Sequence, residues 1–175
     1  MSKRHLAFLA AFGASFIYGV NHTLAKDLMP TYIEAYGFIM LRVLGAAILF
    51  WITSLFLPSE KIDRKDWWRI ILCALFGMTI NMLMFFKGLQ LSTPINSSVV
   101  ITLSPVILLI LSALFLKEKI TWLKASGIAI GLVGALILIL FGAKTQANAP
   151  NIPLGNTLFI INAIAYSVYL ILVKP

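Results

Sequence analysis

The chain has 175 residues, of which 61% are hydrophobic and only 11% are charged, and its mean hydropathy is +0.97. Soluble domains carry about 25% charged residues, so this composition excludes an ordinary soluble domain and predicts an all-α integral membrane protein. The formal net charge of +8 does not indicate a nucleic-acid partner, because the basic residues gather at the ends of apolar stretches.

Six apolar stretches, each long enough to cross a bilayer, follow one another along the chain. Pro30 and Pro58 end the first two, and Thr93 with Pro94 is a typical start for the fourth. We therefore predict transmembrane helices at about residues 6–25, 33–56, 70–86, 94–116, 123–143 and 154–173. The polar residues Lys87 and Gln90 indicate a tight loop after the third helix, and residues 144–153 form the only linker-like segment.

The basic residues predict the orientation of these helices. When the connecting segments are assigned alternately to the two sides, one side holds Lys3, Arg4, Lys61, Arg64, Lys65, Arg69, Lys117, Lys119, Lys124 and Lys174, and the other holds Lys26, Lys87 and Lys144. The side richer in Lys and Arg normally faces the cytoplasm. We expect a cytoplasmic N-terminus, a periplasmic 144–153 linker and a place in the inner (plasma) membrane.

The sixth predicted helix resembles the first. The matching pairs are Leu6 with Leu154, Tyr18 with Tyr166 and Lys26 with Lys174, each 148 residues apart. Because the second copy follows the first by five helices, an odd number, it enters the membrane from the opposite side, as in an inverted-topology repeat. We expect residues 1–143 to form a first five-helix repeat and 154–175 to begin a second, so that the chain is the N-terminal part of a longer protein.

Arg42 lies inside the second predicted helix. A charge near the centre of a membrane helix costs at least about 2.5–3.5 kcal/mol, so it normally faces protein or water. It is a candidate for the wall of a substrate cavity or for a gate. The alternatives are a structural pair, for which Glu34 is the nearest candidate in the sequence, and a side chain that reaches toward the periplasmic surface.

Polar residues inside the other helices supply further cavity candidates. In the first helix, Tyr18, Asn21 and His22 share one helical stripe, and His22 could relay protons or simply pack through a hydrogen bond. The remaining candidates are neutral residues of the third and fourth helices, which could bind a polar ligand or only other helices: Asn81, Asn96, Ser97 and Ser104.

Three further features have less specific interpretations. Pro105 lies mid-helix and predicts a kink, which could be a gate or a static bend. A basic clip at the cytoplasmic membrane edge could stabilise a closed state through a salt bridge or be a solvated turn: Lys117, Glu118 and Lys119. A smooth stripe for helix packing runs along the fifth helix: Gly127, Gly131 and Gly134.

The sequence does not support an enzyme. We find no nucleotide-binding loop, no nucleophile–base set and no metal-ligand cluster, and none of the six carboxylates lies mid-membrane. We therefore expect no cofactor and no metal.

The layout resembles the EamA-type branch of the drug/metabolite transporter superfamily. The similarity is carried by Ser15–Gly19 followed by Lys26, by Arg42, by Lys87-Gly88-Leu89, by Ser104-Pro105-Val106, by Leu116–Lys119 and by the glycine series. It covers one repeat and the first helix of the next, with Tyr18 where members of the family often have tryptophan. The resemblance implies two inverted five-helix repeats around a midplane cavity.

The resemblance further implies a secondary transporter, an exporter by our interpretation, that moves a small metabolite or drug-like solute by alternating access. Its partners would be the lipid bilayer, a small-molecule substrate and either the missing C-terminal repeat or a second copy of the chain. Two alternatives stay open. One is a homodimeric small efflux half-unit, although the first helix lacks the membrane glutamate on which such exporters depend. The other is a non-transporting membrane subunit.

Overall fold

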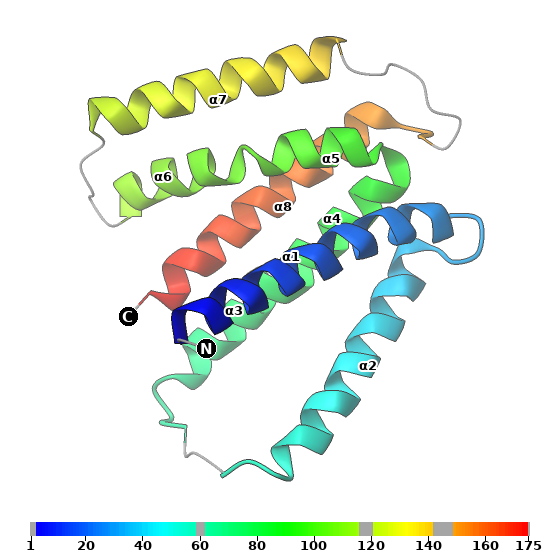
Figure 1. Ribbon diagram of the computed structural model, residues 1–175, viewed down its shortest axis with the longest axis vertical. Helices are drawn as coiled ribbons and strands as arrows, with labels where there is room; N and C mark the ends of the chain where they lie inside the picture. The colour runs from blue at the N-terminus through cyan, green and yellow to red at the C-terminus, as the bar shows by residue number, and fades with distance from the viewer. Residues whose placement is uncertain (1–2, 59–61, 116–120, 142–148, 175) are drawn as a thin grey trace.

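The computed structural model describes residues 3–58, 62–115, 121–141 and 149–174, and the regular structure of these residues is entirely helical (Figure 1). The elements in chain order are α1 (Lys3–Leu28), α2 (Ala35–Ser54), α3 (Trp67–Ala74), the π-helix η1 (Leu75–Ile80), α4 (Asn81–Leu91), α5 (Pro94–Ile101), α6 (Ser104–Phe115), α7 (Trp122–Phe141) and α8 (Ile152–Val173).

Five helical segments of the described chain are long and apolar enough to cross a membrane. The described spans are Arg4–Leu28, Ala35–Ser54, Trp67–Leu91, Pro94–Phe115 and Ile152–Val173, with a shorter apolar helix at Trp122–Gly134. α3, η1 and α4 together make one span, and α5 and α6 together make another. The prediction of an all-α membrane protein is confirmed.

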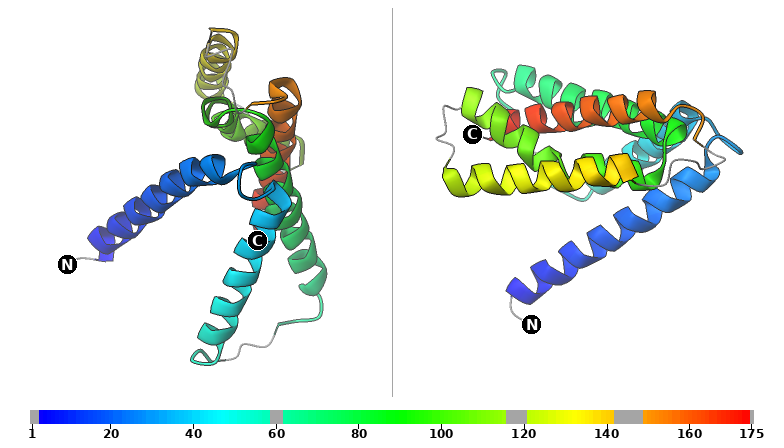
Figure 2. Two further views of the ribbon diagram at one scale, coloured as in Figure 1. Left: turned by 90° about the vertical axis from the view of Figure 1, so that its right-hand side faces the viewer. Right: turned by 90° about the horizontal axis from the view of Figure 1, so that it is seen from above.

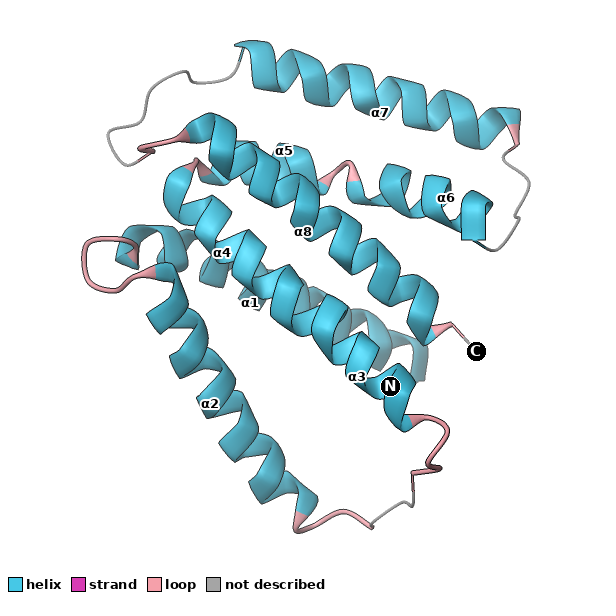
Figure 3. Cartoon of the chain, turned by 180° about the vertical axis from the view of Figure 1, so that it is seen from behind, coloured by secondary structure: helices cyan, strands magenta, loops and turns pink. Residues whose placement is uncertain are grey.

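The centre of the arrangement is the pair α4 and α8, which lie side by side and run in opposite directions (Figures 1 and 3). α5 and α6 pack on α8, α2 packs on α4, and α7 lies beyond α5. Thus α8 is inserted among helices that lie far from it in the sequence, α4 ending at Leu91 and α6 at Phe115. The segment that we predicted to open a second repeat therefore packs against helices of the predicted first repeat.

The hydrophobic core lies at one end of the bundle. It is formed where α1 and α4 end and where α2 and α8 begin, and its buried residues are Ala25, Met29, Ala35, Ile39, Phe85, Phe86, Leu89, Val100 and Phe159. Away from this end α1 and α2 diverge from α4 and α8 (Figure 2). The connecting segments 29–34, 92–93 and 149–151, which are predicted to be periplasmic, lie at the packed end.

Small residues allow α4 and α8 to approach each other at the packed end. A Cβ atom at Gly155 would lie 2.5 Å from Ser92 Cβ and 2.9 Å from the carbonyl oxygen of Gly88, and a Cβ atom at Gly88 would lie 2.9 Å from the Phe159 ring. Glycine is therefore needed at both positions for this close crossing. The backbone N–H of Asn151 also donates to the carbonyl oxygen of Leu91 at 3.0 Å, which joins the start of α8 to the end of α4.

Two basic side chains cap helix C-termini that belong to other segments. The buried Lys26 Nζ donates to the carbonyl oxygens of Leu89 (2.9 Å), Gln90 (3.3 Å) and Ser92 (2.7 Å) at the end of α4. At the opposite end of the bundle, Arg69 Nε donates to the carbonyl oxygen of Leu172 at 2.5 Å, where α8 ends. The last carbonyl groups of a helix have no partner within the helix and carry partial negative charge, so cations stabilise them.

Some helix ends differ from the expected ones. α4 continues to Leu91, so Lys87 and Gln90 belong to its last turn and the predicted tight loop there is wrong. The two side chains stabilise this turn, because Lys87 Nζ donates to Gln90 Oε1 at 3.1 Å. The connection is reduced to Ser92 and Thr93, and the prediction that Thr93 caps the next helix is confirmed by a hydrogen bond from the Asn96 N–H to its side chain.

The predicted fourth helix is interrupted in the middle. A turn at Thr102 and Leu103 separates α5 from α6, and Pro105 lies in the first turn of α6. Proline has no N–H to donate to the carbonyl oxygen of Ile101, and its ring crowds that oxygen, so a continuous helix is disfavoured here. The Thr102 hydroxyl turns back to the carbonyl oxygen of Val99 at 2.6 Å.

Candidate functional site

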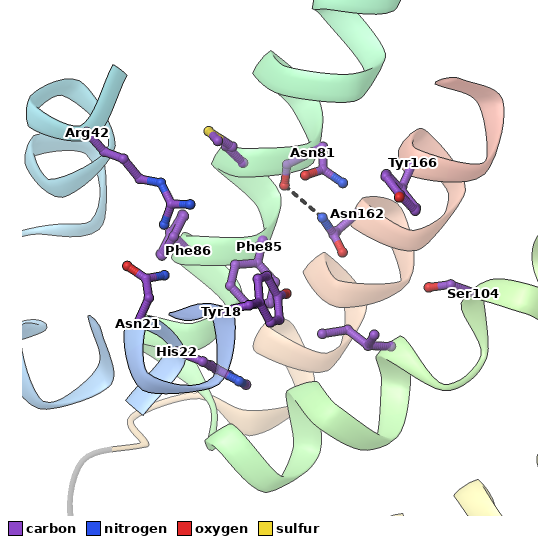
Figure 4. A pocket seen from close by; sticks show the side chains of 12 residues that line it. Tyr18, Asn21, His22, Arg42, Asn81, Phe85, Phe86, Ser104, Asn162 and Tyr166 are labelled. Atoms are coloured by element: carbon purple, nitrogen blue, oxygen red, sulfur yellow. Dashed lines mark hydrogen bonds between the residues drawn. The ribbon is translucent and has the colours of Figure 1, made fainter. Parts of the chain in front are cut away.

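A cavity of about 340 Å³ lies beside the packed end, between α1, α2, α4, α8 and the junction of α5 with α6 (Figure 4). Polar and aromatic side chains from segments far apart in the sequence share its wall. The lining residues are Tyr18, Asn21, His22, Arg42, Asn81, Met82, Phe85, Phe86, Ile101, Ser104, Asn162 and Tyr166. Its position within the spanning helices makes it the candidate functional site.

Arg42 enters the cavity from α2. Its guanidinium carbon lies 5.5 Å from the centroid of the Phe86 ring, a cation–π contact. Within the part of the chain that the structure describes, Arg42 has no ion pair and no hydrogen bond, so the predicted pair with Glu34 is not formed. The Glu34 carboxylate instead accepts a hydrogen bond from Gln90 Nε2. The guanidinium is therefore available to a ligand.

His22 is held by a hydrogen bond to α5. Its Nε2 lies 2.8 Å from Ser97 Oγ, and Ser97 Oγ also lies 2.8 Å from the carbonyl oxygen of Pro94, to which it donates. A hydroxyl has only one proton, so the bond to Pro94 requires that His22 Nε2–H is the donor in the first bond, and this assigns the tautomer from the hydrogen-bond network. The imidazole packs on Phe85, with the ring centroids 5.5 Å apart.

Two tyrosines face the cavity from α1 and α8. Tyr18 and Tyr166 are the pair that the internal similarity aligns, and both line the same space (Figure 4). Each keeps much of its side chain exposed, 51% for Tyr18 and 42% for Tyr166. Rings with exposed faces in a cavity offer stacking surfaces to a ligand.

The part of the cavity wall that α4 forms begins directly after the π-helix η1. Asn81 comes directly after it, and Asn162 Nδ2 of α8 donates to the Asn81 backbone carbonyl oxygen at 2.8 Å (Figure 4). π-helical turns frequently occur at functional sites, because they disturb the regular bonding of the helix and reorient side chains. Here the hydrogen bond from Asn162 joins α8 to the first residue of α4 within the cavity wall.

The structure brings together most of the predicted cavity residues. Tyr18, Asn21, His22, Arg42, Asn81 and Ser104 all line the cavity. Asn96 and Ser97 do not line it. Ser97 is completely buried beneath His22, and Asn96 Nδ2 donates to Ser92 Oγ at 3.3 Å.

The other predicted features lie away from the cavity. The clip Lys117, Glu118 and Lys119 falls outside the described residues, as do residues 144–148 of the predicted 144–153 linker, whose last two residues belong to α8. No described atom outside the neighbouring helical turns lies within 4 Å of a Cβ placed at Gly127, Gly131 or Gly134, so the proposed packing stripe has no partner in the described part of the chain.

Sequence reasoning missed half of the lining residues: Met82, Phe85, Phe86, Ile101, Asn162 and Tyr166. The apolar ones carry no signal, because lipid-facing and cavity-facing positions of a membrane helix are both apolar. Asn162 and Tyr166 could have been found, since they lie one helical turn apart and Tyr166 matches Tyr18 in the internal similarity.

Comparisons with known proteins find relatives that are named as transporters. The chain is 25% identical over 169 residues to the uncharacterized transporter YetK of Bacillus subtilis. These residues cover 96% of this chain and 49% of that protein. It is 28% identical over 144 residues to an uncharacterized transporter of Archaeoglobus fulgidus, covering 82% of this chain and 47% of that protein.

A third relative carries a more specific name. The S-adenosylmethionine/S-adenosylhomocysteine transporter of Chlamydia trachomatis is 26% identical over 139 residues, which cover 79% of this chain and 42% of that protein. The chain thus spans about half the length of the curated relatives that it matches. No solved structure matches it significantly. Residues 5–140, most of the chain, match the EamA-like transporter family, and the protein therefore belongs to that family.

Proposed function

We propose that this chain forms the first half of an inner-membrane secondary transporter that exports a small metabolite or drug-like solute by alternating access. The family and the names of the relatives support a membrane transporter. The solute, the direction and the mechanism are our proposal, as are the cytoplasmic N-terminus and the division into a 1–143 repeat and a second repeat that begins at 154.

The observation that carries the proposal is the cavity itself. It combines an arginine that has neither an ion pair nor a hydrogen bond in the described chain with amide and hydroxyl groups, inside helices that are otherwise apolar. Polar groups in a membrane interior are costly unless a partner or a ligand uses them. A solute site between two related helices, here α1 and α8, is typical of transporters built from inverted repeats.

The unequal packing of the two ends supports alternating access. The buried core occupies the predicted periplasmic end, whereas large hydrophobic side chains of α1 and α2 are exposed toward the other end, Phe12 by 72% and Trp51 by 80% for example. In the proposed cycle, a second repeat would cover these surfaces and rock against the first, so that the cavity opens to one side at a time.

Flux from reconstituted protein tests the proposal. The source reading frame is first sequenced beyond Pro175, and its complete product is placed in proteoliposomes loaded with amino acids, organic acids, nucleosides and quaternary amines. We expect mass spectrometry to show that at least one solute leaves faster than from empty liposomes. Arg42→Ala should abolish this flux, and Arg64→Ala, in the exposed 62–66 loop, should not.

The alternatives predict different results. A folded product that moves none of these solutes at any protein-to-lipid ratio contradicts the transporter and favours a non-transporting membrane subunit. If the reading frame ends at Pro175 and flux rises with the square of the protein density, two copies of the chain form the unit.

Alternating access is tested separately with accessible cysteines. In a Cys73→Ala background, which removes the single cysteine, Asn21→Cys places a thiol in the cavity. We expect a membrane-impermeant maleimide to label it from either side of the membrane, in proportions that change when the transported solute is added. Labelling from one side only, whatever the solute, contradicts the mechanism.

A further inference from the structure

The charge of the cavity wall restricts the solute that it can bind. Arg42 is the only charged side chain among the twelve lining residues, and no carboxylate of the described chain pairs with it. A cation entering this space would be repelled at short range, in surroundings of low dielectric constant. An anion would supply the partner that the guanidinium lacks, and the geometry of a carboxylate fits a guanidinium with two parallel hydrogen bonds.

A second donor lies near the guanidinium. Asn21 of α1 also lines the cavity, and its amide has no hydrogen bond in the described part of the chain. In the view of Figure 4 the Asn21 and Arg42 side chains extend toward the same part of the cavity. The face of Phe86 supports the Arg42 guanidinium at 5.5 Å and holds it near the cavity. An amide N–H and a guanidinium together make a suitable site for an oxyanion.

The rest of the wall favours a flat, apolar body. Tyr18 and Tyr166 have half-exposed rings in the cavity, with the His22 ring tilted against Tyr18 at a centroid distance of 6.4 Å. Exposed aromatic faces bind planar rings by stacking. The volume of about 340 Å³ lies at the small end of the range of about 300–1,000 Å³ for small-molecule sites, so it suits a solute with one or two rings.

We propose that the cavity binds small aromatic carboxylates, with the carboxylate on Arg42 and Asn21 and the ring against Tyr18 and Tyr166. This inference rests on the proposed function, because it names the substrate class of the same cavity. It also predicts an order among related compounds. A carboxylate without an amino group should bind better than the zwitterionic amino acid, since the described wall has no carboxylate for an ammonium group, and the cationic amine should bind worst.

Three compounds with the same phenyl ring test this order: 3-phenylpropionate, phenylalanine and phenethylamine. Tritiated 3-phenylpropionate is bound to the complete product in detergent and displaced by the other two, and hexanoate serves as a carboxylate without a ring. We expect 3-phenylpropionate to bind at least about tenfold more tightly than phenethylamine and several-fold more tightly than hexanoate, because one charge-assisted hydrogen bond alone is worth about tenfold in affinity.

Substitutions assign these preferences to named residues. Arg42→Gln should lower the affinity for 3-phenylpropionate at least about tenfold, while the affinity for the neutral 3-phenylpropanol should not change. Asn21→Asp should lower the affinity for 3-phenylpropionate in the same way although the arginine is kept, because the new carboxylate would lie beside the guanidinium and compete with the ligand. Tyr18→Leu should remove the preference over hexanoate and is expected to fold, since the side chain is half exposed. Arg64→Gln is the control for charge outside the cavity.

The outcomes separate this inference from the proposed function. If the flux assay finds a transported solute but phenethylamine binds as well as 3-phenylpropionate, the substrate class is wrong and the transporter stands. If Arg42→Gln lowers the affinity for 3-phenylpropionate and for 3-phenylpropanol equally, the assigned role of Arg42 is wrong. Absence of binding by all three compounds also overturns the inference, whereas absence of flux for every solute contradicts the transporter.

Discussion

The ammonium group of Lys26 lies 2.7 Å from the carbonyl oxygen of Ser92, although the two residues belong to different spans. The same ammonium also reaches the carbonyl oxygens of Leu89 and Gln90, so one buried cation at the end of α1 caps the C-terminus of α4. The contact holds α1 at the packed end of the bundle, where Ala25 and Met29 join the core.

Removal of the Lys26 ammonium should therefore destabilise the packed end. We expect Lys26→Met to lower the free energy of unfolding by about 2–3 kcal/mol, because buried carbonyl groups lose charge-assisted hydrogen bonds. Unfolding by SDS titration in mixed micelles measures the effect. Lys87→Met is the matched control, since Lys87 is half buried and in the described chain contacts only side chains, the Gln90 amide and the Tyr36 ring, so its loss should cost less than about 1 kcal/mol. Equal effects of the two substitutions would show that the capping contact is not stabilising.

The close crossing of α4 and α8 gives a second prediction. Gly155→Ala should destabilise the protein by about 1–3 kcal/mol, because its methyl group would lie 2.5 Å from Ser92 Cβ and the helices would have to separate. Gly45→Ala in α2, where no such atom lies within 4 Å, should have an effect of less than about 0.5 kcal/mol or increase stability slightly. Thermal unfolding in detergent compares the two variants. A tolerated Gly155→Ala would mean that α8 does not lie this close to α4.

The proton on His22 can be observed directly. With His5→Asn, His22 becomes the only histidine of the chain, and ¹⁵N-labelled histidine then reports its tautomer by NMR. We expect the Nε2–H form at neutral pH, because Ser97 donates its own proton to Pro94 and can only accept from His22. Ser97→Ala should remove this preference. A predominantly Nδ1–H ring in the unsubstituted background would contradict the arrangement.

The interruption between α5 and α6 yields a fourth prediction. Spin labels on cysteines at Ile95 and Leu114, both exposed, measure the distance across it by EPR in a Cys73→Ala background. Pro105→Ala should lengthen this distance, because an N–H at position 105 can extend the helix. Pro94→Ala is the control, since proline at the start of α5 replaces an N–H that no helix bond needs. An unchanged distance in Pro105→Ala would assign the turn to packing against α8.

Much of the fold follows from local sequence signals. Long apolar stretches predict the spans, and Pro30 and the Thr93–Pro94 pair mark where helices end and begin. Lys87 and Gln90 were wrongly predicted to lie in a loop. Polar residues near the membrane surface can be solvated in the last turn of a helix as well as in a loop, so their type does not distinguish the two. The internal similarity predicted that α8 is related to α1, but it contained no information on which helices α8 would contact.

The cavity was only partly accessible to sequence reasoning. Polar residues in apolar helices such as Arg42 and Asn81 stand out, because the membrane makes them costly wherever no partner is found. Phe85 and Phe86 do not stand out, since either side of α4 could face lipid or protein. Ser97 has the residue type of a cavity-lining group but is completely buried, because α5 packs so that its hydroxyl meets His22 Nε2 of α1.

The sequence by itself determined that the protein crosses the membrane, where most of its helices end and that polar side chains such as Arg42 and Asn81 lie within the spans. These properties depend on local composition, since the bilayer requires apolar stretches and helices satisfy their own backbone hydrogen bonds. Only the tertiary structure decided that α8 inserts beside α4, that Lys26 caps a helix from another span and that Tyr18 and Tyr166 share a cavity with Arg42. Contacts between helices depend on how each pair is rotated and how closely the two helices approach. Glycines at particular crossings and single buried hydrogen bonds determine this geometry.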